Sequence, residues 1–160
     1  MAQSPESRKE RVLLISDNRK ARFDFEVVET IEAGLVLLGT EVKGLREHGV
    51  QLKDSYVVFR QGALYLQGAH ISPYRAASYN NHIPERLRKL LLSAQQIARI
   101  ERALAEKGLS CIPLKVYFKG RWAKVELGVA KGKKAHDKRD SIKKKDIARE
   151  LSQVRRGREK

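Results

Sequence analysis

The sequence predicts a mainly β protein with a few short helices and a basic tail that is disordered on its own. Two observations predict the sheet: apolar and polar residues alternate along several segments, and short turn signals separate pairs of these segments. A third observation predicts the tail. Residues 131–160 carry 13 Lys/Arg and 5 Asp/Glu, whereas the preceding 130 residues carry 21 and 14. We therefore expect a structured β domain followed by an unstructured basic segment.

The length of 160 residues suits one compact core and is too short for two. The first eleven residues are polar and charged, so we expect a flexible N-terminal arm over residues 1–15. Within it, Val12–Ile15 is apolar and predicts either a short first strand or an anchor for the arm. The β domain is expected over residues 16–130, and the basic tail over residues 131–160.

The first part of the β domain predicts two strands and a helix. Phe23–Val27 alternates apolar with acidic residues, as a half-buried strand does. Glu32–Gly34 predicts a turn before a short buried strand over Leu35–Gly39. Thr40 can then cap a helix that Gly49 can stop.

A hairpin and two helices are predicted next. The segment 54–71 alternates on both sides of Gln61–Gly62, which suits a tight hairpin turn. Over residues 84–91, a proline at the first turn and three leucines along one side predict a helix. Ser93 and Gln96 form a capping box for a second helix.

The last hairpin is the clearest of the predicted elements. Apolar residues alternate along 112–129 on both sides of a turn at Gly120–Arg121, while lysines lie beside Tyr117 and Trp122 on the other face. About six short strands with two or three helices fit a small closed barrel of the OB type, because closure removes exposed strand edges. A two-layer α+β sandwich is the alternative.

Composition limits the class of protein. The formal net charge of +15 favours an anionic partner, and nucleic acid is the leading candidate. A membrane surface is the weaker alternative, because no patch of bulky aromatic residues accompanies the basic run. Cys111 is the only cysteine, and no segment resembles a secretory signal or a membrane span. We therefore expect a cytoplasmic protein.

The motifs of catalysis and of metal binding are not found in the sequence. A loop "GVAKGKK" fails as a phosphate loop because its glycines are too close together and Lys134 stands where Ser/Thr is needed. The four histidines are scattered and have no cysteine neighbours at metal-ligand spacing; they are His48, His70, His82 and His136. We therefore expect no cofactor, no metal and no enzymatic activity.

Clusters of cations lie beside aromatic residues. Any one cluster is typical of a solubilising surface, and an aromatic on a sheet is often a cross-strand packing residue. Together they favour RNA binding, which uses cations for phosphates and aromatic rings for bases. The clusters are Asn18–Arg22, Lys43 with Arg46, Arg86 with Arg88 and Lys89, and Lys115, Lys119 and Lys124 with Tyr117 and Trp122.

The tail has latent helical character. No proline follows Pro113, and Ile147, Leu151 and Val154 fall on one face of a helix over residues 138–156. Such a helix is marginal alone in water, because single helices take most of their stability from packing. We expect a disordered tail that folds against a polyanion, and the alternative is a tail that only solubilises the protein.

The chain resembles the small protein B family, the SsrA-binding proteins of bacteria, between Asn18 and Arg139. The resemblance implies an OB-fold barrel with flanking helices that binds the tRNA-like part of transfer-messenger RNA. It also implies delivery of that RNA, with elongation factor Tu, to stalled ribosomes in trans-translation, while the tail becomes helical in the empty mRNA channel. The segments that carry it are "NRKARFD", "EAGLVLLGTEVKGLRE", "LKDSYV", "HISPY", "RKLLL" and "PLKVYFKGRWAKVELGVAKGKKAHDKR".

The resemblance also implies which residues act. The family's RNA-binding positions fall on Asn18, Arg19, Arg22, Glu32 and Leu91, and a carboxylate such as Glu32 can accept from a base amino group. With the neighbouring cations, the predicted RNA-binding residues are Asn18, Arg19, Lys20, Arg22, Glu32, Lys43, Arg46, Lys89, Leu91 and Lys124. The predicted residues for the small-subunit decoding site are Gly132, Lys133, Lys134, His136, Asp137, Lys138 and Arg139.

Two other functions are kept as alternatives. A general OB-type RNA-binding or ribosomal protein would have the same basic balance. An RNA-modifying or RNA-cleaving enzyme would need a catalytic constellation, which the sequence does not offer.

Overall fold

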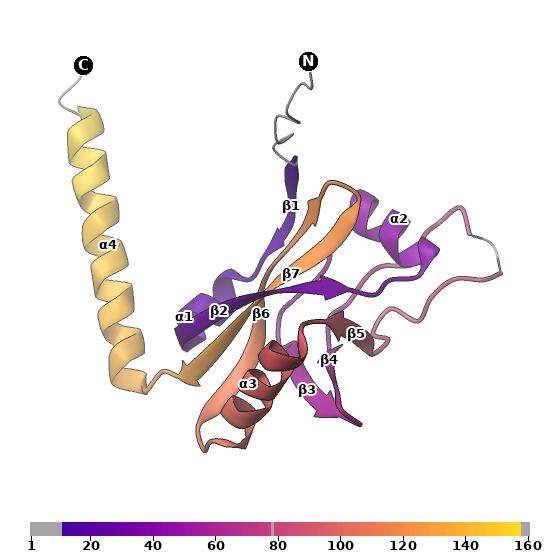
Figure 1. The fold of residues 1–160 in the computed structure, drawn as a ribbon. Helices are drawn as coiled ribbons and strands as arrows, with labels where there is room; N and C mark the ends of the chain where they lie inside the picture. The colour runs from indigo at the N-terminus through magenta and orange to yellow at the C-terminus, as the bar shows by residue number, and fades with distance from the viewer. Residues whose placement is uncertain (1–10, 78, 158–160) are drawn as a thin grey trace, which may run out of the picture.

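The computed structural model describes residues 11–77 and 79–157, which form one curved antiparallel sheet and four helices (Figure 1). The order of the strands in the sheet is β1-β6-β7-β2-β5-β4-β3. The strands are β1 Val12–Asp17, β2 Phe25–Leu35, β3 Tyr56–Arg60, β4 Ala63–Gln67, β5 Arg88–Leu91, β6 Leu109–Lys119 and β7 Trp122–Gly132. The helices are α1 Arg19–Asp24, α2 Gly39–His48, α3 Ala94–Ala105 and α4 Ala135–Gly157.

The two predicted hairpins are confirmed. β3 and β4 pair antiparallel around Gln61 and Gly62, both of which have positive φ, of 49° and 76°. Two left-handed residues in a row make the turn whose twist matches that of the flanking strands. β6 and β7 pair along their full lengths, and Gly120 supplies the positive φ of their turn.

The N-terminal strand corrects the expected extent of the arm. Val12–Asp17 pairs antiparallel with β6, so the chain is part of the sheet from Val12 onward rather than from residue 16. Residues 1–10 of the predicted arm lie outside the described part of the chain. Val12–Ile15 was predicted to be either a short first strand or an anchor for the arm. Its pairing with β6 shows that it is a strand.

β2 is one continuous strand, so the predicted turn at Glu32–Gly34 is wrong. These three residues pair with Glu126, Val125 and Lys124 of β7. Glycine is common in turns, but Gly34 lies inside the sheet, where a neighbouring strand comes close to it. A Cβ on Gly34 would lie 3.1 Å from the Cβ of Leu91 on β5, so the bare glycine leaves room for the leucine.

The helix predicted over residues 84–91 is also wrong, because its second half is strand β5. Arg88 and Leu90 are buried, whereas Lys89 and Leu91 are exposed, which is the period of two of a strand. Leucines at 87, 90 and 91 suit a helix equally well on spacing alone. Contacts of Arg88 with distant parts of the chain decide the outcome and are described below.

The ends of two helices test the capping predictions. Ser93 and Gln96 form the predicted capping box at the start of α3. α2 begins at Gly39 rather than at a Thr40 cap, because the Glu41 carboxylate accepts the backbone N–H of Leu38 at 2.8 Å. α2 ends at His48, and Gly49, whose φ is 72°, stops the helix as predicted.

The core lies inside the curved sheet. Leu66, Leu90, Val116, Val125 and Leu127 line it and are almost fully buried. α3 packs on β6 at one end, and β3 packs across β6 without being its neighbour in the sheet. The barrel is therefore of the predicted OB-like kind, but it is open rather than fully closed by hydrogen bonds.

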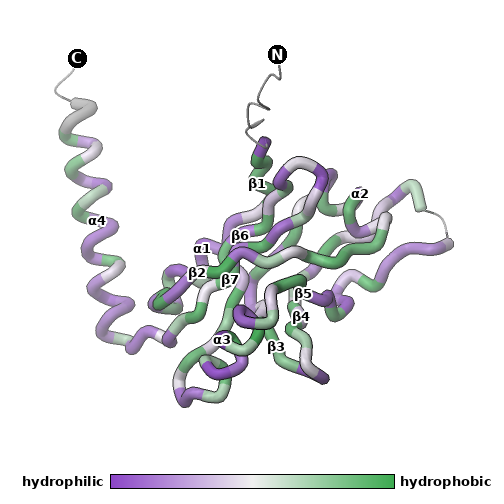
Figure 2. The backbone as a smooth tube through the Cα atoms, in the orientation of Figure 1, coloured by the Kyte–Doolittle hydropathy of each residue, from purple (hydrophilic) through white to green (hydrophobic). Residues whose placement is uncertain are grey.

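The structure has a helix in the tail. Helix α4 begins at Ala135, before the predicted start at residue 138, and extends away from the sheet (Figure 1). The expectation that the free tail is disordered and folds against a polyanion stays a prediction. Figure 2 shows that the helix is mostly hydrophilic, and its residues are largely exposed. Asp137 in its first turn favours the helix, because a carboxylate there interacts well with the helix dipole. Contacts with α1 at the start of α4 also favour it.

Candidate nucleic-acid interface

The outer face of the sheet aligns several of the predicted residues. Gly34 of β2 pairs with Leu91 of β5 on one side and with Lys124 of β7 on the other. Lys124 in turn pairs with Tyr117 of β6. Leu91, Lys124 and Tyr117 therefore lie in one row across the sheet, and Glu32 lies on the same face two residues before Gly34.

Glu32 is held within a cluster of positive and neutral donors. Its carboxylate accepts a hydrogen bond from the Tyr117 hydroxyl and lies 3.8 Å from Nζ of Lys119 and 3.9 Å from Nζ of Lys124. Burial, the hydrogen bond to Glu32 and the charges of Glu32 and Glu126 all raise the pKa of Tyr117, so its hydroxyl stays a donor. Two lysines thus offset the charge of Glu32, and the carboxylate is oriented by Tyr117.

A groove of about 440 Å³ begins beside this row. Its exposed walls include Trp122, 62% exposed, and Leu91, 55% exposed, and Lys124 also lines it. The guanidinium of Arg121 lies 5.4 Å from the Trp122 ring centroid. An exposed indole, an exposed leucine and two cations form a surface on which a flat base can stack while its phosphate meets a cation.

Helix α2 flanks the groove and carries two predicted cations. Val42 of α2 lines the groove, and the Arg46 guanidinium lies 4.9 Å from the ring centroid of Phe118. Lys43 Nζ lies 5.2 Å from the ring centroid of Tyr74. Lys89, exposed on β5, is on the same face of that strand as Leu91. α2 and β5 therefore extend the positive surface beyond the groove.

A buried ion-pair network fixes α2 to the sheet. The Glu41 carboxylate accepts from Arg88 at 2.9 Å and from Arg86 at 2.8 and 3.0 Å. Arg88 also donates to the backbone oxygens of Ala69 and Pro84. Burial opposes the charge of Glu41, but the hydrogen bonds from Arg86 and Leu38 and the charges of Arg88 and Arg86 keep its pKa below the usual value.

The Glu41 network corrects one interpretation of the sequence. Arg86, Arg88 and Lys89 looked like one exposed cationic cluster, but Arg88 is fully buried and Arg86 is committed to Glu41. Of the three, Lys89 alone points outward from its strand. No local sequence pattern predicts this network, because its partners are 45 or more residues apart.

Asn18 is the cap of α1 and is only 7% exposed. Its Oδ1 accepts from the backbone N–H of Ala21 at 3.1 Å, and its Nδ2 donates to the carbonyls of Leu52 at 3.2 Å and Pro113 at 2.9 Å. The amide is therefore committed inside the protein. The structure shows that Asn18 holds α1 in place. The direct RNA contact expected of it stays a prediction.

The cations of α1 lie around this cap. Arg19 is exposed, Lys20 pairs with Asp54 at 3.0 Å, and Arg22 pairs with Asp17 at 3.0 Å. The Lys20–Asp54 pair is exposed, and such a pair is weak in water, so Lys20 can exchange its partner for a phosphate at little cost. The Asp17 side chain of the other pair is mostly buried, so Arg22 is held more firmly.

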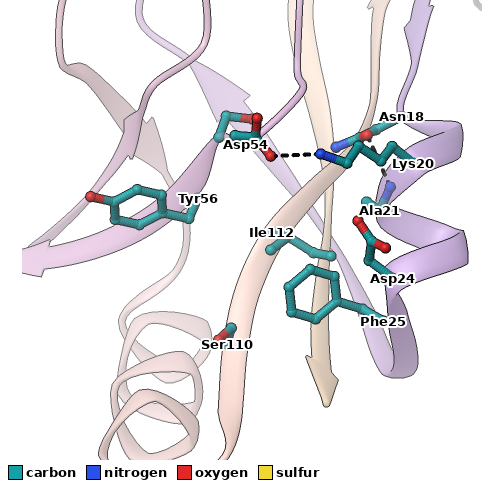
Figure 3. Close-up of a pocket in the computed structure, with 10 residues that line it drawn as sticks. Asn18, Lys20, Ala21, Asp24, Phe25, Asp54, Tyr56, Ser110 and Ile112 are labelled. Atoms are coloured by element: carbon teal, nitrogen blue, oxygen red, sulfur yellow. Dashed lines mark hydrogen bonds and ion pairs between the residues drawn. The ribbon is translucent and has the colours of Figure 1, made fainter. Parts of the chain in front are cut away.

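A second cavity, of about 320 Å³, opens beside α1 (Figure 3). Phe25 and Ile112 form its apolar floor, and the Lys20–Asp54 ion pair crosses its rim (Figure 3). Tyr56, which is not among the predicted residues, lines it with an exposed ring. Its rim carries both signs of charge, so the cavity does not extend the positive surface.

The predicted tail residues begin next to α1. Lys133 Nζ donates to the carbonyl of Arg22, and Lys138 pairs with Asp24 at 3.3 Å. His136 Nδ1 lies 3.6 Å from Asp137 and 3.5 Å from Asp140. The remaining predicted tail residues Gly132, Lys134 and Arg139 are exposed at the end of β7 and around the start of α4.

The predicted residues thus form two groups at opposite ends of β2. Glu32, Leu91 and Lys124 join Lys43, Arg46 and Lys89 around the groove, near the end of β2. Asn18, Arg19, Lys20 and Arg22 join the start of the tail, near the beginning of β2. An 11-residue strand spans roughly 33 Å at ~3.3 Å per residue, so a ligand that contacts both groups must be large.

Within 11–77 and 79–157, no three His, Cys, Asp or Glu side chains come together as a metal-binding group. No helix in the same ranges has both the length and the apolar composition to cross a membrane.

Comparisons with known proteins agree on one family. The family model described as SmpB protein matches residues 15–157. The SsrA-binding protein of Bdellovibrio bacteriovorus is 55% identical over 150 residues, which cover 93% of this chain and 99% of that protein. The SsrA-binding protein of Syntrophobacter fumaroxidans is 54% identical over 158 residues, which cover 99% of this chain and 98% of that protein.

A solved structure is also similar. A chain of "tmRNA-SmpB: a journey to the center of the bacterial ribosome" is 49% identical, with a TM-score of 0.64, over 75% of this chain and 85% of that chain. Both the sequence and the fold therefore match along most of the chain.

Proposed function

This chain belongs to the SmpB family, and on that basis we propose that it binds transfer-messenger RNA and delivers it to stalled bacterial ribosomes for trans-translation. The observation that carries the proposal is the match with SsrA-binding proteins over nearly the whole chain, 93% and 99% of it for two relatives. The positive groove with its exposed indole is a surface that suits RNA independently of the family match.

Two surfaces share the binding of RNA. The groove group binds RNA through Lys43, Arg46, Lys89 and Lys124 at phosphates, and through Leu91 and Trp122 against bases. Glu32, oriented by Tyr117, accepts from a base amino group. Arg19, Lys20 and Arg22 of α1 add phosphate contacts, while Asn18 holds α1 in place.

The tail acts on the ribosome. Gly132, Lys133, Lys134, His136, Asp137, Lys138 and Arg139 engage the decoding site on small-subunit rRNA, and the rest of α4 enters the empty mRNA channel. A helix with largely exposed cations suits a channel lined by phosphates. The protein works in the cytoplasm by binding rather than by catalysis, needs no cofactor, and meets elongation factor Tu indirectly through the RNA.

Selective RNA binding is the direct test of this function. We expect the tRNA-like domain of transfer-messenger RNA to bind at least about tenfold more tightly than an unrelated hairpin, which is ~1.4 kcal/mol. Affinities for both RNAs are measured at two salt concentrations, because salt dependence alone follows from any set of phosphate contacts. Equal affinities at both salts would instead identify a general RNA-binding protein, which is the second candidate.

Trp122→Ala tests the groove. We expect the affinity for the tRNA-like domain to fall roughly tenfold to a hundredfold, since stacking of one base on an aromatic ring is worth ~1–3 kcal/mol. Tyr79→Ala is the matched control, because Tyr79 is an exposed aromatic, 95% exposed, that lies outside the groove. The groove assignment is wrong if both variants bind as the wild type does, or if both lose the same affinity.

A further inference from the structure

We propose that Arg121 binds a phosphate of the RNA at the groove and that the ring of Trp122 holds its guanidinium in place. A base stacks on the indole, and an adjoining phosphate of the same strand meets Arg121. The contact with RNA rests on the function proposed above, whereas the contact between the two side chains lies within the protein itself. Arg121 is not among the predicted RNA-binding residues.

The two cations that line the groove differ in what already holds them. Lys124 Nζ lies 3.9 Å from the Glu32 carboxylate and shares it with Lys119. Arg121 is exposed, and among the residues that the structure describes it forms no ion pair with a carboxylate. Its guanidinium instead lies 5.4 Å from the ring centroid of Trp122. A phosphate therefore does not have to displace an anion to reach Arg121.

The turn between β6 and β7 fixes the backbone from which both side chains extend. Gly120 has a φ of 63°, and its N–H donates to the carbonyl of Arg11 at 3.1 Å. Trp122 begins β7 and pairs with Lys119 at the end of β6. Because the turn is tied to the sheet on both sides, the backbone at Arg121 has little freedom, and its side chain stays close to the indole.

A guanidinium that stacks on an aromatic ring can still bind a phosphate. Its N–H donors lie in the plane of the group and point outward from its edge, so stacking leaves them available. Trp122 is 62% exposed, so part of its ring remains accessible to a base. Surfaces that bind single-stranded RNA combine such stacking with cations along the backbone. Arg121 and Trp122 therefore offer one nucleotide both kinds of contact.

The alternative role of this pair is to stabilise the hairpin turn. A cation–π contact at an exposed site is weak. The turn is also held by the pairing of β6 with β7 and by the hydrogen bond of Gly120. RNA affinity separates the two roles, because a contact that only stabilises the turn leaves the affinity unchanged.

Arg121→Gln in the full chain tests the phosphate contact. We expect the affinity for the tRNA-like domain of transfer-messenger RNA to fall roughly tenfold, at the low end for one charge-assisted hydrogen bond. The dependence of log K on log salt is expected to become shallower by about 0.7 to 0.9, the value for one phosphate. Arg60→Gln is the matched control and is expected to change both much less, because Arg60 is an exposed arginine beside the turn of the other hairpin, outside the groove.

A double-mutant cycle tests whether Trp122 holds Arg121. In the Trp122→Ala chain the arginine has already lost the ring, so Arg121→Gln is expected to cost less affinity there than in the wild type. We expect the tenfold loss to shrink to about threefold or less, as for two residues in direct contact. Equal losses in the two chains would show that the residues act independently.

Fluorescence reports the contact without RNA, because Trp122 is the only tryptophan in the chain. Acrylamide is expected to quench it more strongly in Arg121→Gln than in the wild type, since the guanidinium no longer covers part of the ring. Arg60→Gln is expected to be quenched as the wild type is. Equal quenching in all three chains would show that Arg121 is not held on the indole.

The proposed function and the role of Arg121 fail in different ways. If the chain bound the tRNA-like domain no more tightly than an unrelated hairpin, the function would fail, while Arg121→Gln would still weaken the binding of both RNAs. If Arg121→Gln lost no more affinity than Arg60→Gln while the selectivity remained, the role of Arg121 alone would be overturned.

Discussion

Replacing Glu41 by glutamine is expected to lower the free energy of unfolding by about 3 to 5 kcal/mol, because it leaves the buried charge of Arg88 without its anion. Glu41 and Arg88 are both fully buried, and Nε of Arg88 lies 2.9 Å from the carboxylate. Arg86 loses its partner in the same change. Glutamine keeps the shape of the side chain, so the loss measures the charge and its hydrogen bonds rather than a cavity.

Urea denaturation of the full chain measures this loss. Glu47→Gln is the matched control, because Glu47 lies on the same helix α2, is exposed and contacts only its neighbour His48 among the ion pairs of the described residues. The control is expected to change the free energy of unfolding by less than about 0.5 kcal/mol. If both variants lost a similar free energy of unfolding, the loss in Glu41→Gln would come from the change of net charge and not from the buried network.

The same variant has a defined dependence on pH. The pKa of Glu41 is lower in the folded state than in the unfolded state, so its stabilising effect is present above the unfolded pKa. It is lost as the pH falls through the folded pKa, where the carboxyl becomes protonated. We therefore expect the difference in stability between the wild type and Glu41→Gln to be largest near neutral pH and to shrink in acid. A constant difference from pH 7 to pH 3 would contradict this.

Removing the tail after Lys134 is expected to abolish tagging on stalled ribosomes while leaving the affinity for the tRNA-like domain unchanged. The position of the cut matters. A cut after Val129 would remove Ala130, which is buried, together with Lys131 and Gly132, which pair with β2. A cut after Lys134 keeps β7 whole and removes helix α4 entirely.

The measurement is the transfer of the peptide tag to a nascent chain made on a message without a stop codon. A chain cut after Gly157 is the control, because it keeps all of α4, and it is expected to tag as the full chain does. RNA affinity measured on the same samples separates a ribosomal defect from an RNA-binding defect. Full tagging by the chain that ends at Lys134 would show that α4 is dispensable.

Local signals in the sequence were enough for several elements. The hairpin at Gln61 and Gly62, the capping box of Ser93 and Gln96, and the final hairpin each depend on residues close together in the chain. Where a local pattern fits two kinds of secondary structure, the prediction made from it was wrong. The leucines at 87, 90 and 91 fit a helix or a strand, and Glu41 on a distant helix settled the matter by burying Arg88.

The candidate site, like the fold, could be predicted from the sequence only in part. Motif segments identified the family, and the family in turn predicts that Glu32, Leu91 and the tail cations bind RNA. Spacing could not show that Asn18 is committed to the carbonyls of Leu52 and Pro113, which are 34 and 95 residues away.

Local sequence, then, was sufficient for the two hairpin turns, the capping box of α3, the basic tail and the family. It could not tell which charges are buried or how the surface residues are grouped. Those properties depend on the pairing of strands that are far apart in the chain: Leu91, Gly34 and Lys124 meet only because β5, β2 and β7 are neighbours in the sheet.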